Sequence, residues 1–257
     1  MSHDRSDGER VTAKMPGREA LTPPLPRRFY KTAVHAAEGD GFAVRLDGRI
    51  AKTPGKRALI VKSERLAQAL AAEWSAQGER IDPVTMPLTR FVNTAIDGVV
   101  GNEAAVRDDI VGFAGSDLLC YRAERPAELV AEQAVLWDGV LDWADRVLGA
   151  HLTVATGVMP RDQPAEAIAS IDRHLARFDA FELTALHLMT TLTGSALLAL
   201  AHAEGHLSVA EAWSAAHVDE DWQIRLWGED TEASERRERR WKDMRAASQL
   251  LDLLQHR

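Results

Sequence analysis

A pair of histidines is the first feature of this sequence whose spacing could support chemistry. His202 and His206 stand four positions apart, a spacing that could let two imidazoles share a metal ion with a carboxylate. Gly205 and Ser208 indicate, however, that one helix ends and another begins at this point. We therefore expect solvated histidines at a helix end, and we expect His187, on an apolar helix, to be a hydrogen-bonded core residue.

Two further motifs could indicate phosphate binding or a nucleophile. The sequence PGKR at 54–57 has the lysine of a phosphate-binding loop but lacks the upstream glycine and the Ser or Thr after the lysine, so we expect a hairpin turn. Cys120 lies in a short apolar stretch without a recognisable base, which is typical of a small buried hydrophobe. The sequence therefore predicts no enzyme, with no catalytic residue, cofactor or metal.

Seven tryptophans against two tyrosines favour a protein-binding surface. Tryptophan is enriched at binding hot spots, but it also fills cores. Both interpretations stay open for Trp222 and Trp227, which lie next to the acidic cluster at 219–221. For Trp74, the first expected helix needs a large residue to dock on the sheet, so a core position is favoured. The predicted partner-binding residues are Trp74, Asp219, Glu220, Asp221, Trp222, Gln223 and Trp227.

The elements that must position these residues form two unequal parts. Residues 1–26 are polar and proline-rich and predict a flexible lead. Short runs of β-formers separated by Gly-rich turns predict a β-rich N-terminal domain over 27–87, with a capped amphipathic helix lying on its sheet. We expect its strands at 29–34, 42–46, 49–51 and 58–61, and its helix between Ser63 and Gly78.

Apolar periodicity after Pro87 predicts a helical C-terminal domain over 88–257, so the fold class is α+β. The helix from Ala127 carries two adjacent apolar stripes, wider than one core-facing seam needs, and is either fully buried or partner-facing. We expect helices at 88–99, 103–114, 127–149, 164–178, 180–203, 208–228 and 230–254.

Charge and hydropathy exclude some partners. The net charge of −8 disfavours nucleic acid, because such binding neutralises many phosphates. The stretch 183–203 has no charged residue and is about long enough to cross a bilayer. It carries several Thr residues and lacks basic or aromatic anchors, so we expect a central buried helix and no stable membrane insertion. A membrane-attached assembly factor remains the rival reading.

The location predicted from the sequence is the bacterial cytoplasm. The single cysteine excludes an internal disulfide. The N-terminal 28 residues have no apolar run of signal-peptide length, and their four acids, Asp4, Asp7, Glu9 and Glu19, argue against a mitochondrial transit peptide. We expect a monomer when the protein is free.

Seven motifs together, by their order and spacing, resemble one known family over residues 27–245. The family is that of the assembly chaperones that act on the α subunit of the ATP synthase catalytic head. The motifs are GFAVRLDGR at 41–49, KTP at 52–54, AEWSAQ at 72–77, MPLTR at 86–90, NTAID at 93–97, DLLCYR at 117–122 and WQIRLWG at 222–228.

The resemblance implies a small β-rich domain followed by a larger helical one, and binding of the unassembled ATP synthase α subunit until it pairs with β. It implies no ATP hydrolysis. It also matches the family's Ala-Glu-Trp tryptophan to Trp74 and its acidic segment to Asp219, Glu220 and Asp221. The alternative function is a small-molecule enzyme with its site in a cleft between the two parts, which requires a ligand-sized pocket with perturbed acids or histidines.

Overall fold

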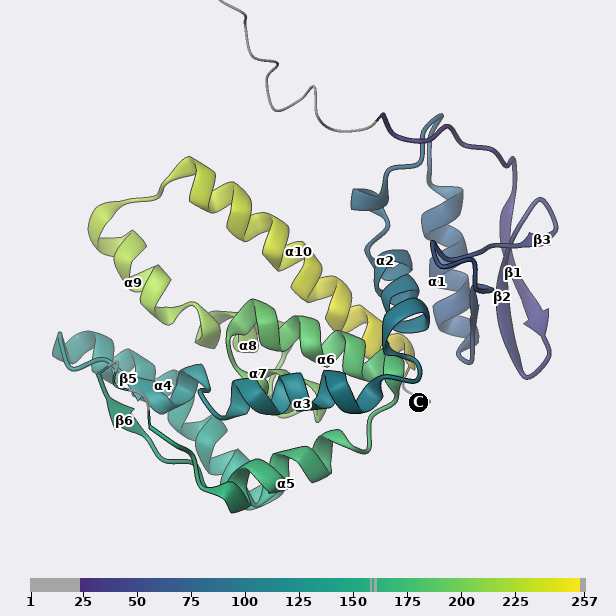
Figure 1. Cartoon of the computed structure of the whole chain (residues 1–257). Helices are drawn as coiled ribbons and strands as arrows, with labels where there is room; N and C mark the ends of the chain where they lie inside the picture. Colours follow the sequence, from purple (N-terminus) through teal and green to yellow (C-terminus); the bar gives the residue numbers. More distant parts are fainter. Residues whose placement is uncertain (1–23, 158, 160, 255–257) are drawn as a thin grey trace, which may run out of the picture.

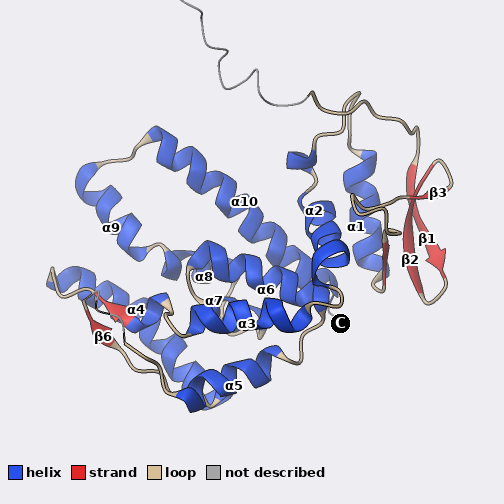
Figure 2. Ribbon diagram, in the orientation of Figure 1, coloured by secondary structure: helices blue, strands red, loops and turns tan. Residues whose placement is uncertain are grey.

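A four-stranded antiparallel sheet and ten α-helices make up most of the described part of the chain (Figure 1). The structure is a computed structural model that describes residues 24–157, 159 and 161–254. Except for residues 24–26, the predicted flexible lead lies outside the described residues. The sheet and the first helix lie at one end, and the remaining helices form the larger part, which confirms the predicted α+β class (Figure 2).

Two tight turns connect the first three strands of the sheet. The chain turns between β1 and β2 at Gly39 and between β2 and β3 at Asp47 and Gly48, and all three residues have positive φ. The first strand begins at residue 33, so the prediction of a strand over 29–34 was wrong. The strands are β1 (Ala33–Glu38), β2 (Gly41–Leu46), β3 (Arg49–Ile50) and β4 (Ile60–Val61), the last pairing with β2.

The displaced first strand has a local cause. The backbone N–H groups of Lys31 and Thr32 donate to the Asp47 carboxylate at 3.0 and 2.8 Å, so they do not take part in the hydrogen bonds between strands.

The predicted helix on the sheet is confirmed as α1 (Glu64–Ser75), capped by the Ser63 hydroxyl, which accepts from Leu66 N. Fully buried Leu66 and Leu70 place this helix in the core with the sheet.

The next segment is helical, as predicted, with two π-helical turns that extend α2 and α4. A short parallel pair, β5 (Tyr121–Arg122) with β6 (Ala155–Thr156), was not predicted, because two-residue strands have no readable periodicity. The elements are α2 (Pro87–Thr94) with Ala95–Val99, α3 (Glu103–Ala114), α4 (Ala127–Trp143) with Ala144–Leu148, and α5 (Ala165–Leu175).

The apolar stretch 183–203 forms two helices, so the predicted single helix over 180–203 was wrong. α6 (Ala180–Thr193) ends at Gly194, whose φ of +71° suits a left-handed helix end. α7 (Ala196–Ala203) begins directly afterwards, because the Ser195 hydroxyl accepts from Leu198 N. Among the described residues, no helix is long and apolar enough to cross a membrane.

A second predicted helix, over 208–228, is also divided. α8 (Val209–Ala216) and α9 (Val218–Trp227) meet at His217, whose φ of −117° leaves the helical range and whose ring Nδ1 lies 2.8 Å from Trp213 O. α10 (Thr231–Leu254) then runs back along α6 and α2 to α1. Its last turn meets the first part directly, since the Ser63 hydroxyl donates to Leu253 O.

One hydrophobic cluster joins the sheet, α1, α2 and the central helices of the described chain. It extends from Val44 in the sheet to Leu250 in α10, both fully buried. α6 lies at its centre, against α3, α7 and α10 (Figure 1). The division into domains after residue 87 stays a prediction.

Candidate partner-binding surface

The helix α9 carries most of the predicted partner-binding residues, and the three acidic ones lie at its N-terminal end. Asp219, Glu220 and Asp221 lie in its first turn, where carboxylates favour the helix dipole. Trp222 is half-buried and packs against the core, with the Arg225 guanidinium 5.3 Å from the centre of its ring. Arg225 also pairs with Glu132 of α4. These contacts fix one face of α9 and leave the other toward solvent.

Two of the three acids hold α9 in place. The Asp219 carboxylate accepts from Gln133 Nε2 at 2.7 Å, and the Gln133 side chain is only 1% exposed. Asp221 pairs with Arg237 of α10 at 2.5 Å. The Glu220 carboxylate lies 4.0 Å from Nε2 of His217, a histidine whose pKa is lowered by burial. Of the three, Glu220 has the weakest internal contact.

The C-terminal end of α9 exposes large apolar side chains. Trp227 is 83% exposed and Leu226 is 58% exposed, and the helix ends at Gly228 with a φ of +85°. A hollow of about 250 Å³ lies between this end and the start of α10, and Gln223, Trp227 and Arg237 are among its lining residues. An exposed indole beside a mainly apolar hollow is typical of a binding surface.

Trp74 lies away from α9. It is on α1, at the opposite end of the molecule from α9 (Figure 1). Its backbone carbonyl accepts from the Tyr30 hydroxyl at 2.7 Å, and the two rings meet edge to face with centroids 5.6 Å apart. The structure therefore brings six of the seven predicted residues together on one helix and leaves Trp74 in a separate place.

Residues that the sequence did not single out complete the α9 surface. Gln133 and Glu132 on α4 and Arg237 on α10 orient the helix, and Leu226 adds exposed apolar area. Local pattern carried no signal for Leu226, because two adjacent large apolar residues on a helix indicate only that they cannot both be buried, and the structure exposes both. Gln133 and Glu132 on α4 stand 86 or more residues before their partners on α9, and Arg237 on α10 stands 16 residues after Asp221. Local sequence patterns could not reveal contacts at these separations.

The histidine pair does not converge on a metal. His202 has its ring nitrogens 3.0 Å from Leu207 O and 2.9 Å from the Ser248 hydroxyl, whereas His206 stacks on Trp143. No cluster of three or more metal-binding side chains occurs in the described residues. His187 is hydrogen-bonded, to Asp109 at 2.7 Å, but its side chain is 37% exposed. The prediction that it lies in the core was therefore wrong, because it faces α3 at the surface.

The other two motifs have structural roles. Cys120 is buried, as predicted, and burial raises the pKa of its thiol to about 12, which leaves no thiolate near neutral pH. The PGKR segment forms the predicted turn, in which the Gly55 N–H donates to the Asp97 carboxylate at 2.7 Å and Lys56 N donates to Thr53 O. The alternative function of an enzyme requires a pocket between the two predicted parts. The hollows at Trp74, α9 and His187 are each lined by residues of only one of these parts.

The chain is similar to known chaperones over most of its length. The model of the ATP12 chaperone protein family matches residues 27–145. Mitochondrial protein atp12 of Schizosaccharomyces pombe is 24% identical over 244 residues, which are 89% of this chain and 84% of that protein.

Two crystal structures have the same fold. Atu1473, a putative chaperone from Agrobacterium tumefaciens, is 51% identical with a TM-score of 0.87, over 95% of this chain and 93% of that one. Atp12 from Paracoccus denitrificans is 40% identical with a TM-score of 0.85, over 90% and 99%. The family resemblance of the sequence motifs is thereby confirmed, and the chain belongs to the ATP12 chaperone family.

Proposed function

We propose that this protein is an ATP synthase assembly chaperone that binds the unassembled α subunit of the catalytic head and prevents its aggregation until it pairs with β. The single observation that carries the proposal is the exposed end of α9, where Trp227 and Leu226 stand on a helix fixed by contacts to α4 and α10. Membership of a chaperone family supports it. The protein acts in the bacterial cytoplasm and needs no cofactor.

The proposed mechanism is temporary burial of an apolar surface. An α subunit without its partners exposes apolar area that favours aggregation. Trp227 and Leu226 cover part of this area, while Glu220 and Gln223 form a polar rim around them. Since α9 is already fixed by internal contacts, binding costs little ordering of the chaperone. Release follows when β offers a larger, obligate interface.

The predicted residues divide into two roles in this proposal. Trp227, Gln223 and Glu220 contact the α subunit. Asp219 and Asp221 position the helix through Gln133 and Arg237, and Trp222 anchors the helix in the core. Trp74 lies outside this surface and takes part in a separate one, described below.

The test is to express the ATP synthase α subunit alone with this protein and then to add β. A soluble complex of the α subunit with this protein that dissociates when β is added supports the proposal. A matched pair of variants locates the surface: Trp227→Ala reduces the recovered complex, and Val84→Ala, which truncates an exposed apolar side chain elsewhere, leaves it unchanged. An α subunit that aggregates equally with and without this protein contradicts the proposal.

A further inference from the structure

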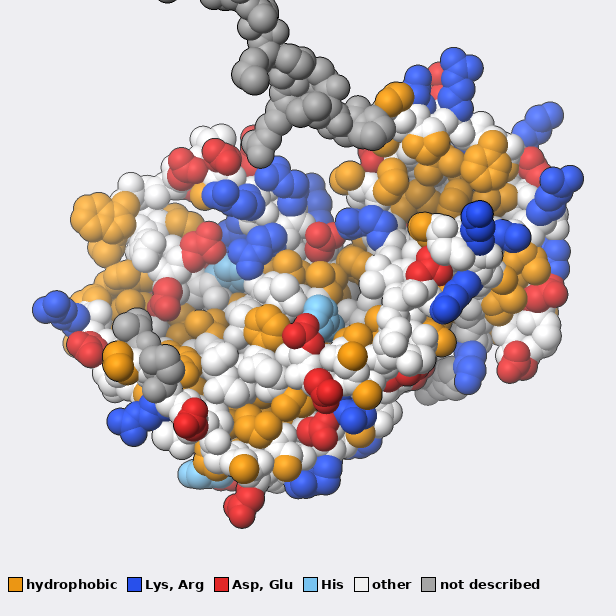
Figure 3. Space-filling model, viewed as in Figure 1, with side chains coloured by type: hydrophobic (Ala, Val, Ile, Leu, Met, Phe, Trp, Pro, Cys, Tyr) orange, Lys and Arg blue, Asp and Glu red, His pale blue; other side chains and the backbone are white. Residues whose placement is uncertain are grey.

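The N-terminal part of the chain is basic, although the whole chain is acidic. Residues 24–62 contain nine Lys or Arg and three Asp or Glu, in a protein whose net charge is −8. Basic side chains surround an apolar patch on the face that this part presents in Figure 3. A concentrated positive field of this kind attracts anionic partners that the rest of the surface repels.

A hollow of about 540 Å³ lies within this basic surface. Tyr30, Leu46 and Ala51 are its buried lining residues, and half-buried Trp74 also lines it. Phe29 stands at the same hollow and is 73% exposed. The hollow therefore combines an apolar floor with an exposed aromatic side chain, which suits the insertion of an apolar side chain from a partner.

A second hollow, of about 620 Å³, shares Tyr30 with the first. Its lining includes Arg27, Arg80 and Gly78, which lies in the segment after α1. The two hollows thus follow one another along the segment from Arg27 to Tyr30. Such an arrangement fits an extended chain better than a compact small molecule.

The positive charges of the first hollow are available to a ligand. The side chains of Arg49 and Lys52 make no ion pair or hydrogen bond with any other described residue, and both are exposed. Asp47, the one acid lining this hollow, already accepts from the backbone of Lys31 and Thr32, and these hydrogen bonds lower its pKa. A partner that enters this hollow therefore finds Arg49 and Lys52 without an ion pair to any described residue, and the Asp47 carboxylate already hydrogen-bonded.

Trp74 adds a second, independent observation. Its indole Nε1 is buried and has no hydrogen-bond partner among the described residues. A buried N–H without an acceptor destabilises a fold, and an aromatic ring without an N–H would not carry that cost. Core packing alone thus does not explain the indole, whereas large aromatic area at a binding groove does.

We propose that this surface binds an extended acidic peptide segment of a partner protein. An aromatic or branched apolar side chain of the segment enters the hollow beside Phe29 and Trp74, and its flanking carboxylates pair with Arg49 and Lys52. The hollow shape favours a peptide over an anionic membrane, because a membrane surface offers no protruding side chain to fill it. The inference goes beyond α-subunit binding by α9 and does not depend on it.

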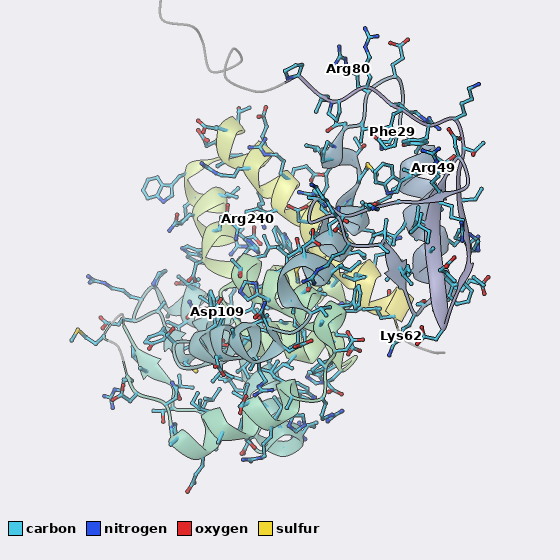
Figure 4. All side chains as sticks on the ribbon, turned by 45° about the vertical axis from the view of Figure 1, so that its right-hand side comes forward. Phe29, Arg49, Lys62, Arg80, Asp109 and Arg240 are labelled. Atoms are coloured by element: carbon cyan, nitrogen blue, oxygen red, sulfur yellow. The ribbon has the colours of Figure 1, made fainter. Side chains whose placement is uncertain are left out.

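The test uses a labelled synthetic peptide in which one phenylalanine stands between runs of aspartate and glutamate, titrated with the full-length protein by fluorescence anisotropy. We expect the double variant Arg49→Glu, Lys52→Glu to weaken binding roughly tenfold or more and Phe29→Ala to weaken it about fivefold. Lys62→Glu is the matched control, since Lys62 is an exposed lysine at the other end of the same part (Figure 4). It should change affinity less than about twofold.

Three comparison ligands separate the explanations. A peptide with alanine in place of the phenylalanine should bind more weakly, and one with lysines in place of the acids should not bind. Vesicles containing an anionic lipid report on the membrane alternative. Vesicle binding without peptide binding, or equal loss of peptide affinity in the Lys62→Glu control, would overturn the proposal. Because no α subunit is used, failure here leaves the proposed function untouched.

Discussion

Gln133 Nε2 on α4 donates a hydrogen bond to the Asp219 carboxylate on α9 at 2.7 Å. The same amide accepts from the Ala123 N–H through its oxygen at 2.9 Å. A single buried side chain therefore ties the strand region before α4 to the first turn of the proposed binding helix. The acidic segment of α9 consequently has a structural role beside any role in binding.

Removing the carboxylate of Asp219 should therefore destabilise the fold. Asp219→Ala leaves the Gln133 amide, which is almost fully buried, without its acceptor, and we expect a loss of about 1–3 kcal/mol in the free energy of unfolding. Urea denaturation measures it. Gln223→Ala on the same helix is the control, because Gln223 is exposed and should change stability by less than about 0.5 kcal/mol. Equal stability of the two variants contradicts this role for Asp219.

Asp117 should make stability depend on pH. It is fully buried, and burial raises its pKa to about 6, although Leu119 N and Leu197 N donate to its two oxygens. Between its ordinary pKa of 3.8 and about 6, the folded protein holds a proton that the unfolded chain releases. This contribution to the free energy of unfolding is thus complete below pH 3.8 and is lost as pH rises through 6, a change of about 3 kcal/mol.

The variant Asp117→Asn isolates that contribution, because it cannot titrate. It should be less stable than the parent chain, since its amide offers an N–H where the carboxylate accepts one from the backbone. We expect the stability advantage of the parent chain over the variant to be larger near pH 4 than near pH 7, in urea titrations at both values. A difference that is the same at the two pH values contradicts a raised pKa for Asp117.

Gly194 should be required for the break between α6 and α7. Its φ is +71°, and an added Cβ would meet no atom within 4 Å, so only the backbone conformation disfavours a side chain. Gly194→Ala should therefore lower stability by about 1 kcal/mol. Gly139→Ala, at an exposed position inside α4 with equally open space, should instead raise it by up to about 1 kcal/mol. Thermal unfolding of both variants decides, and stabilisation by Gly194→Ala would contradict the account.

The sequence predicted elements whose signals are local. β2 and the capped helix α1 follow from alternation, turn glycines and the Ser63 cap. The breaks at Gly194 and His217 were missed because the apolar pattern continues through them, and only the backbone conformation at these two residues ends each helix. An isolated glycine within an apolar pattern is compatible with either a helix interior or a helix end.

The candidate site was predictable only in part. Apolar residues next to acids marked α9 as a possible surface, but they could not separate exposed Trp227 from half-buried Trp222. That separation depends on which face of α9 meets α4 and α10, and therefore on pairs such as Gln133 with Asp219 that are distant in sequence. The hollow at Phe29 and Trp74 likewise needs segments 45 residues apart to meet.

The affinity of the isolated ATP synthase α subunit for this protein and for its Trp227→Ala variant tests the central claim most directly. Trp227 is 83% exposed, so its truncation should leave the thermal midpoint nearly unchanged. We predict that the dissociation constant rises about tenfold or more, the loss expected for a binding hot spot. An unchanged dissociation constant in a variant of unchanged thermal midpoint would contradict the claim that the end of α9 binds the α subunit.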